Sequence, residues 1–238
     1  MNVSVVIPAF NEEKRLEPSL QRITEFLEKN FENFEILVVD DGSKDTTPEI
    51  VQKFKEKKVK LIQNPKNMGK GFSVKLGMIN AQHDYILFTD ADLATPIEET
   101  TKFLEAIKQG YDVVIASRNV EGANITVEQP KYRQVLGKAF PLLVKSMVLP
   151  DFKDTQCGFK MFTKQAARKI FPRQTIKRWA FDVEIIFIAK KLGYKIKELP
   201  VTWTDKEGSR LSPVKDSFRM LNEVAKIKYN EIKGEYKP

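Results

Sequence analysis

Short apolar runs alternate with amphipathic stretches over the first half of the chain. The runs with the length and the Val, Ile and Phe content of strands are 3–10, 34–41, 59–63, 84–92 and 111–118. Apolar residues recur at helical spacing between them, near 13–30, 45–57, 69–82 and 96–110. Strands that are apolar throughout and alternate with helices indicate parallel strands covered on both faces. The pattern predicts an α/β fold: a Rossmann-like, doubly wound, mostly parallel sheet with helices on both faces.

The rest of the chain gives no sign of a second unit. No internal repeat, low-complexity tract or change of composition divides the 238 residues, so we expect a single domain over 1–238. Near its end, the stretch SFRMLNEVAKIKYNEI places apolar residues at helical spacing. This predicts a C-terminal amphipathic helix over 214–233, which we expect to fold back onto the domain.

Polar residues follow four of the predicted strands. The strand ends read PAFNEE, DDGS, DAD and SRNVEG; three of them carry carboxylates and the fourth carries Arg118. In open α/β sheets, ligands bind beyond the carboxyl ends of the strands. The four strand ends therefore predict a polar binding site at one edge of the sheet.

Asp90 and Asp92 define the chemistry expected at this edge. If the strand continues through them, their side chains share a face and lie roughly 6–7 Å apart. Two carboxylates so close repel each other unless a cation lies between them. Hard divalent cations prefer oxygen ligands, so the pair predicts a site for Mg²⁺ or Mn²⁺. Lys70, flanked by two glycines at a predicted helix start, is a candidate for contact with phosphate.

Composition excludes several other kinds of site. Cys157 and His83 are the only residues of their types, which leaves no disulfide and no His/Cys zinc cluster; a Cys157–His83 nucleophile pair is the remaining, disfavoured alternative. The loop after the first strand has no glycine, as a dinucleotide-binding G-x-G-x-x-G would require, and NMGKGFSV does not fit a P-loop. The chemistry must then depend on Asp, Glu, Lys and Arg.

Charge and hydropathy indicate the kind of partner. The net charge is +8, so we expect an anionic partner. No basic and aromatic residues interleave as in nucleic-acid motifs, and we expect no nucleic acid. No stretch reaches the roughly 18 apolar residues of a membrane span, and the first residues lack the features of a signal peptide. We therefore expect a cytoplasmic protein.

These motifs together resemble those of nucleotide-sugar glycosyltransferases of family 2, which have the GT-A fold. VVIPAFNEE, VVDDGSKDTT and DAD occur in that family's order and approximate spacing. In the second half, the segments 154–162 (DTQCGFKMF) and 178–211 (from RWAFDVE to EGSRL) resemble dolichyl-phosphate β-glucosyltransferases and related polyprenyl-phosphate glycosyltransferases. The resemblance covers about residues 3–230.

The resemblance implies a role for each matching residue. Those implied to bind the donor are Pro8, Ala9, Asn11 and Glu12 around the nucleoside, Asp41 near the base or ribose, Lys70, Asp90, Ala91, and Arg210 in a loop that closes over the donor. Asp90 and Asp92 match the motif whose metal ion grips the diphosphate, and Asp92 is also expected to be catalytic. Arg118 and Arg133 match residues that hold the acceptor phosphate. Asp182 and Glu184 are candidates to orient the acceptor or take a proton.

The reaction expected from the resemblance is an inverting transfer of a hexose, glucose from UDP-glucose, onto a polyprenyl or dolichyl phosphate at the cytoplasmic membrane face. Mannosyl members often carry Gln two residues after the metal motif, where this chain has Ala94. Eukaryotic glucosyl members carry a membrane helix; here we expect peripheral binding to an anionic membrane surface, through the apolar segment 135–150.

Several alternatives stay open at this stage. The donor could instead be GDP-mannose or UDP-N-acetylglucosamine, and the acceptor could be a sugar hydroxyl, which would require a general base. A non-catalytic protein that binds nucleotide sugars or lipid phosphates is disfavoured by the intact Asp90 and Asp92. A basic nucleic-acid-binding protein is the least favoured alternative.

Overall fold

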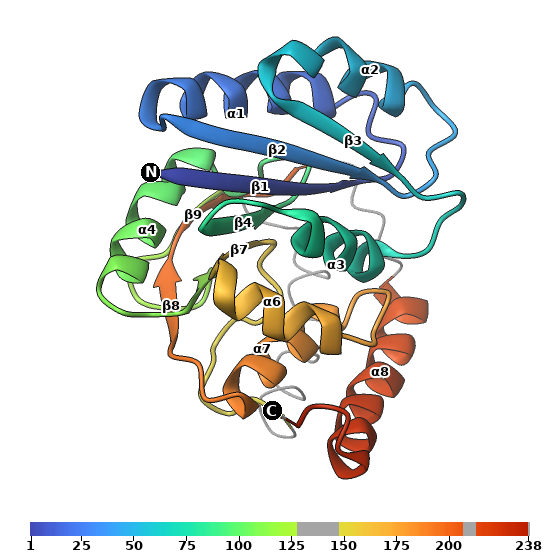
Figure 1. The fold of residues 1–238 in the computed structure, drawn as a ribbon. Coiled ribbons are helices and arrows are strands. Elements are labelled where there is room, and N and C mark those ends of the chain that lie inside the picture. The colour runs from blue at the N-terminus through green and yellow to red at the C-terminus, as the bar shows by residue number, and fades with distance from the viewer. Residues whose placement is uncertain (128–147, 207–212, 238) are drawn as a thin grey trace.

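A mixed sheet is the central element of the computed structural model, which describes residues 1–127, 148–206 and 213–237 (Figure 1). Among those residues the sheet has seven strands, in the spatial order β3 (Val59–Gln63), β2 (Asn33–Asp40), β1 (Asn2–Ala9), β4 (Tyr85–Thr89), β7 (Phe159–Thr163), β5 (Val113–Ser117) and β8 (Ile196–Pro200). Neighbouring strands are parallel except at β7, which runs antiparallel to both β4 and β5. The predicted α/β fold class is confirmed.

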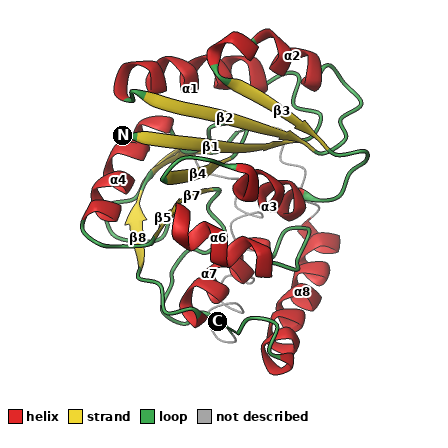
Figure 2. Ribbon diagram, viewed as in Figure 1, coloured by secondary structure: helices red, strands yellow, loops and turns green. Residues whose placement is uncertain are grey.

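Helices cover both faces of this sheet (Figure 2). They are α1 (Leu16–Asn30), α2 (Thr47–Lys53), α3 (Lys70–Asn80), α4 (Thr100–Lys108), α6 (Lys164–Arg173), α7 (Phe181–Lys191) and α8 (Pro213–Lys233), with the short 3₁₀ helices η1 (Lys55–Lys57) and η2 (Ile97–Glu99). The core on one face joins the sheet to α1, α2 and α4, and the core on the other joins it to α3, α6, α7 and α8. Each helix and strand predicted for the first half of the chain is therefore present.

Successive residues of β1 supply the two cores in turn. Val5 and Ile7 pack with α1, whereas Val6 packs with α3. A strand buried on both faces needs apolar residues at every position, because successive side chains point to opposite faces. This explains why the sequence shows continuous apolar runs here and no alternation of apolar with polar residues.

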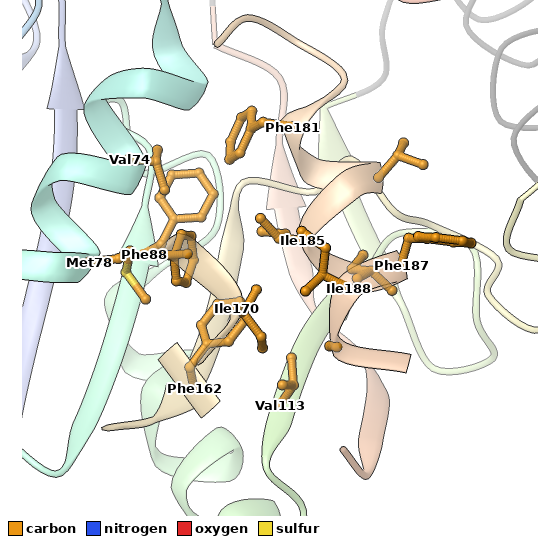
Figure 3. Close-up of a cluster of buried hydrophobic side chains, with 14 of the residues drawn as sticks. Val74, Met78, Phe88, Val113, Phe162, Ile170, Phe181, Ile185, Phe187 and Ile188 are labelled. Carbon is orange, nitrogen blue, oxygen red and sulfur yellow. The ribbon is translucent and has the colours of Figure 1, made fainter. Parts of the chain in front are cut away.

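The core beside α3 and α7 supports the edge at which the polar strand ends meet (Figure 3). Phe88, near the end of β4, meets Phe181, at the start of α7, edge to face with ring centroids 5.8 Å apart. Val74 and Met78 of α3 lie on the other side of Phe88. This packing fixes the end of β4 and the starts of α3 and α7 relative to one another.

The strand predicted over 84–92 is wrong at its end. β4 stops at Thr89, and a turn follows in which the Leu93 N–H donates to the Asp90 carbonyl oxygen at 3.2 Å. Leu93 has a φ of 49°, in the left-handed region. Asp90 and Asp92 are therefore residues of a turn, and the alternation of side chains along a strand does not explain why they are close.

The last part of the chain folds back onto the domain. α8, in the segment for which an amphipathic helix is predicted, buries Met220, Val224 and Ile227 in the core that includes α7. Tyr229 and Ile232 on the same helix are 55% and 85% exposed.

A second, two-stranded sheet pairs β6 (Asn124–Val127) with β9 (Thr202–Thr204) in parallel. No helix in the described ranges is long and apolar enough to cross a membrane.

Most of the segment 135–150, expected to contact a membrane, lies outside the described residues. Its end is described, and there the prediction is wrong: Val148 and Leu149 are buried in the core beside α6 and α7. Apolar side chains committed to the core are not available to insert into lipid. Residues 135–147 remain as the part to which the prediction can apply.

The close contact of α3 with β1 can be tested at Gly77. A Cβ atom there would lie 2.3 Å from Val6 Cγ1 and 3.0 Å from Val39 Cγ2. We expect Gly77→Ala to lower the free energy of unfolding by ~1–3 kcal/mol through overpacking, although alanine is the better helix former. Chemical denaturation measures this. In a Val6→Ala background the cost should shrink, because the nearest methyl groups are gone. An equal cost in both backgrounds would contradict the packing described.

Candidate active site

The parallel direction of β1, β2, β4 and β5 brings their carboxyl ends to one edge of the sheet, as predicted. The loops that follow these strands carry Glu12, Asp41, Asp90 and Arg118. The neighbouring β7 is preceded by Cys157 at the same edge, because Phe159 of β7 pairs with Thr89 of β4. His83 precedes β4 at the opposite end of the strands, which excludes the Cys157–His83 pair.

The loop after β1 is joined to the loop after β2 by side-chain hydrogen bonds. The Asn11 N–H donates to Ser43 Oγ at 2.7 Å, and the Lys44 N–H donates to Asn11 Oδ1 at 2.7 Å. Asn11 has a φ of 51°, a conformation that asparagine tolerates better than most residues. Pro8 is half-buried and Ala9 is buried in the core. Of the residues expected around the nucleoside, Asn11 and Glu12 are thus the ones on the loop itself.

Glu12 holds an arginine beside the carboxylates that follow β4. Arg15 Nε and Nη2 donate to the two oxygens of Glu12, both at 2.8 Å. Arg15 Nη1 lies 3.6 Å from Asp92 Oδ2. Arg15, the residue before α1, is not among the predicted site residues, although its place three positions after Glu12 was a usable signal.

Asp41 has a role that sequence reasoning did not foresee. Its buried carboxylate accepts hydrogen bonds from Asn64 Nδ2 at 2.9 Å, the Met68 N–H at 2.8 Å and the Gly69 N–H at 2.9 Å. These bonds shape the loop that leads into α3. Through these bonds the buried Asp41 positions the first residue of α3, and its predicted contact with the base or ribose stays a prediction.

Lys70 is that first residue, and its ammonium group reaches the carboxylates. Nζ lies 2.6 Å from Asp90 Oδ1, 5.6 Å from the ring centroid of Phe88 and 5.5 Å from that of Trp179. Burial opposes the charge, but Asp90, with Asp182 and Asp92 behind it, raises the pKa of the ammonium group. Lys70 is therefore positively charged at neutral pH.

The turn after β4 holds Asp90 and Asp92 close enough to repel each other. Burial and then the charge of Asp90 raise the pKa of Asp92, against the Ala94 N–H, which donates to Asp92 Oδ1 at 3.1 Å, and against Arg15. Ala91 between them is buried in the core. Both carboxylates keep part of their surface in contact with solvent.

Gly158 makes room for the Asp90 side chain. A Cβ atom at this position would lie 2.0 Å from Asp90 Oδ2, and the Asp90 N–H donates to the Gly158 carbonyl oxygen at 3.1 Å. No other residue fits against the carboxylate without displacing it. Gly158 belongs to the DTQCGFK segment that carries the family resemblance, but its contact with Asp90 is visible only in the fold.

Asp182 forms a buried ion pair behind Lys70. Lys160 of β7, which is fully buried, donates to Asp182 Oδ1 and, at 2.6 Å, to the Cys157 carbonyl oxygen. Burial raises the pKa of Asp182 in spite of Lys160 and Lys70. Asp182 stands in the first turn of α7, where the helix dipole favours a negative charge. It is the one of the two FDVE carboxylates whose charge acts on Lys70 and Asp90.

Glu184 points away from the site and is fully buried. Its oxygens accept hydrogen bonds from Thr175 Oγ1 at 2.7 Å, the Ile176 N–H at 2.7 Å and the Tyr236 hydroxyl at 2.6 Å. These bonds tie α7 to the loop before it and to the end of the chain. The structure therefore gives Glu184 a structural role, and we do not retain it as a candidate base.

Arg118 is held by a carboxylate of the DTQCGFK segment. Its Nε and Nη2 donate to Asp154 Oδ2 at 2.7 Å and Oδ1 at 3.0 Å, and its Cζ lies 5.3 Å from the ring centroid of Trp203. Burial raises the pKa of Asp154, but Arg118 outweighs this and keeps it below its usual value. Arg133 and Arg210 lie outside the described residues.

The carboxylates suit a hard divalent cation only in part. In the part of the chain that the structure describes, no three His, Cys, Asp or Glu side chains gather into a metal cluster. Asp90 and Asp92 nevertheless supply paired oxygen ligands whose repulsion a cation relieves. A site of one or two carboxylates completed by substrate phosphates and water is what Mg²⁺ commonly uses. The residues present fit a metal ion that arrives with a diphosphate.

Comparison with known proteins agrees with this arrangement. Residues 4–171 match the family described as Glycosyl transferase family 2. A dolichyl-phosphate beta-glucosyltransferase of Dictyostelium discoideum is 35% identical, and the similarity covers 99% of this chain and 76% of that protein. One from Trichomonas vaginalis is 41% identical over 93% of this chain and 69% of its own.

Solved structures share the fold. Mannosyl-3-phosphoglycerate synthase from Rubrobacter xylanophilus has a TM-score of 0.69 at 18% identity, covering 100% of this chain and 76% of that one. Glucosyl-3-phosphoglycerate synthase from Mycobacterium tuberculosis, in complex with Mn²⁺ and UDP-glucose, has a TM-score of 0.64 at 13% identity, covering 94% and 77%. These likenesses show the GT-A fold that the sequence motifs imply. With the family match over most of its length and relatives above 30% identity over nearly all of it, the chain belongs to glycosyl transferase family 2.

Proposed function

We propose that this glycosyltransferase, acting as a single GT-A domain, transfers glucose from UDP-glucose to a polyprenyl phosphate of the dolichyl type. The observation that carries the proposal is the pair Asp90 and Asp92, flanked by Lys70 and Arg15, in a chain similar over nearly its whole length to dolichyl-phosphate beta-glucosyltransferases. A carboxylate pair between two cations suits a metal-bound diphosphate.

On the donor side, Asp90 and Asp92 would hold Mg²⁺ or Mn²⁺. When bound, the metal ion neutralises the charge that develops on the departing nucleoside diphosphate. Lys70 supplies a further positive charge from the start of α3, and Gly158 keeps Asp90 in place. The fold shared with a synthase solved with Mn²⁺ and UDP-glucose supports this choice of metal and donor.

On the acceptor side, Arg118 and Arg133 would hold the lipid phosphate. Arg118 is kept in position by Asp154 and by the ring of Trp203, so its orientation is set before the acceptor arrives. A phosphate monoester is an anion near neutral pH, with a second pKa of ~6, and attacks without a strong base. Attack from the side opposite the diphosphate inverts the anomeric centre. Asp182 would orient the acceptor.

A polyprenyl acceptor stays in the bilayer, so the protein must bring its site to a membrane. We propose peripheral association with an anionic surface at the cytoplasmic face, through residues 135–147. The proposal rests on their sequence, VLGKAFPLLVKSM, in which apolar side chains accompany Lys138 and Lys145. α8 is the second candidate, but its apolar face is already packed on the domain. Among its large apolar side chains described over residues 219–233, Tyr229 and Ile232 are the exposed ones.

Asp92→Asn tests the catalytic assignment. We expect kcat/KM for transfer from UDP-[¹⁴C]glucose to a polyprenyl phosphate to fall by about 1,000-fold (~4 kcal/mol), because one of two metal ligands loses its charge. Without metal, the melting temperature should be unchanged or slightly higher, because the repulsion from Asp90 is relieved.

The matched control is Asp84→Asn, at an exposed position before the other end of β4. It should keep wild-type turnover. Wild-type turnover in Asp92→Asn, or full wild-type activity in excess EDTA, would contradict the metal site. Transfer from another nucleotide sugar alone, in a panel of donors, would contradict UDP-glucose as the donor.

The acceptor role of Arg118 requires a variant that leaves no buried charge unpaired. In Arg118→Gln, Asp154→Asn, a neutral hydrogen-bonded pair replaces the ion pair. We expect acceptor kcat/KM to fall about thirtyfold (~2 kcal/mol), the loss of one charge-assisted contact with phosphate, while calorimetry shows unchanged UDP affinity. A selective loss of UDP affinity would show that Arg118 serves the donor.

We also expect the stability of the double variant to depend on pH differently from that of the wild type. Because the pKa of Asp154 is lowered in the folded protein, its ion pair stabilises the wild type above the unfolded pKa of ~3.9, and this stabilisation is lost as pH falls further. The melting temperature should therefore fall less between pH 7 and pH 3 in the double variant than in the wild type. An identical acid-side loss would contradict the pairing.

Flotation with anionic vesicles tests membrane association. The wild type should float with vesicles that contain phosphatidylserine, and less so in high salt. Leu143→Glu should reduce flotation, whereas Ile232→Glu, at an exposed position on α8, should not. Absence of wild-type binding, or equal flotation of the two variants once circular dichroism has shown both to be folded, would exclude residues 135–147 as the attachment.

A further inference from the structure

Each carboxylate of the Asp90–Asp92 pair already has a cation from the protein beside it, but the two cations are held very differently. Arg15 lies 3.6 Å from Asp92 and makes two hydrogen bonds to Glu12, so the Glu12 carboxylate neutralises most of the charge of Arg15. Lys70 Nζ lies 2.6 Å from Asp90 Oδ1, and Asp90 is the only acid with which it forms an ion pair among the described residues. Lys70 is the cation that depends on the pair itself.

The position of Lys70 is built into the fold. Asp41 fixes the Gly69 N–H, and Gly69 adopts a φ of 107° that favours glycine. The ammonium then lies between Asp90 and the rings of Phe88 and Trp179, where it is attracted by the carboxylate and by both aromatic faces. With its side chain 21% exposed, Lys70 is only partly open to solvent.

An ammonium group and a divalent cation cannot share this oxygen without strong repulsion. At a separation of a few ångströms in a partly buried site, solvent screens the repulsion of like charges only weakly. A metal ion that binds Asp90 must therefore displace Lys70, unless a new anion arrives to neutralise the ammonium. The diphosphate of a nucleotide sugar is such an anion.

We propose that Lys70 is the counter-ion of Asp90 as long as no donor is bound. Its charge weakens the binding of a free divalent cation to Asp90, and it leaves Asp90 to the cation when a diphosphate binds as well. Lys70 then couples the binding of metal to the binding of donor: metal alone binds weakly, and the donor removes the obstacle by giving the ammonium a second partner. The inference rests on the proposed function in one respect, that the donor carries a diphosphate.

The test measures Mn²⁺ binding without any turnover. Free Mn²⁺ is read by electron paramagnetic resonance during titration of the protein, in the absence of nucleotide. Lys70→Met removes the charge and keeps an unbranched side chain of similar length against Phe88 and Trp179. We expect it to bind Mn²⁺ about tenfold more tightly than the wild type. Lys70→Arg, which keeps the charge, should bind as weakly as the wild type.

The control for general electrostatics is Lys177→Met, at an exposed lysine in the loop that packs against Gly69. It removes the same charge near the site and should leave Mn²⁺ affinity unchanged. In the presence of Mn²⁺, UDP affinity measured by calorimetry should fall about tenfold in Lys70→Met and stay unchanged in Lys177→Met. Thermal unfolding shows that each variant is folded.

Equal Mn²⁺ affinity in the wild type and Lys70→Met, whether high or undetectable, would overturn the inference, as would an equal gain in Lys177→Met. A loss of UDP affinity without a gain in Mn²⁺ affinity would leave Lys70 as a simple phosphate contact and would also overturn it. Failure of the proposed function is a separate result: no transfer to any polyprenyl phosphate would leave the Mn²⁺ titration unaffected.

Discussion

The repulsion between Asp90 and Asp92 is the constraint on which the site depends. Two carboxylates in a turn at the end of a buried strand raise each other's free energy, and the structure offsets this with Lys70 and, less directly, Arg15. Behind them the same alternation continues, since Asp182 faces Lys160. The negative charges are thus balanced by cations of the protein itself, and in the function we propose a metal ion would take over part of this role without a change in the fold.

Residues far apart in the sequence hold these charged side chains in position. Asp41 binds the N–H groups that precede Lys70, so a residue after β2 sets the start of α3. Gly158, before β7, accepts the Asp90 N–H and leaves room for its carboxylate. The antiparallel β7 between β4 and β5 thereby joins the turn at Asp90 to Arg118, whose partner Asp154 lies in the segment before β7. The DTQCGFK motif thus links the Asp90 and Arg118 parts of the site.

The sequence correctly predicted the features that depend on local patterns. The predictions were wrong or incomplete where contacts between residues distant in the sequence determine the structure. Continuous apolar runs predicted the strands, apolar residues at helical spacing predicted the helices, and the alternation of the two predicted the edge that carries Asp90 and Arg118, because these patterns are local. The predicted end of β4 is wrong, because the turn at Asp90 depends on its contact with Gly158. Glu184 is a predicted site residue because it stands two positions after Asp182, and the sequence does not show its bond to Tyr236, 52 positions away. Lys160 was missed, since nothing local indicates that a strand lysine will be buried.

The central claim is that the Asp90–Asp92 edge binds a metal ion and a nucleoside diphosphate together. Calorimetric titration of the wild-type protein with UDP, in saturating Mn²⁺ and again in EDTA, tests it most directly. We expect UDP to bind at least about a hundredfold more tightly with Mn²⁺, and by linkage an equal gain in Mn²⁺ affinity when UDP is present. Equal UDP affinity with and without the metal ion would contradict joint binding at this edge.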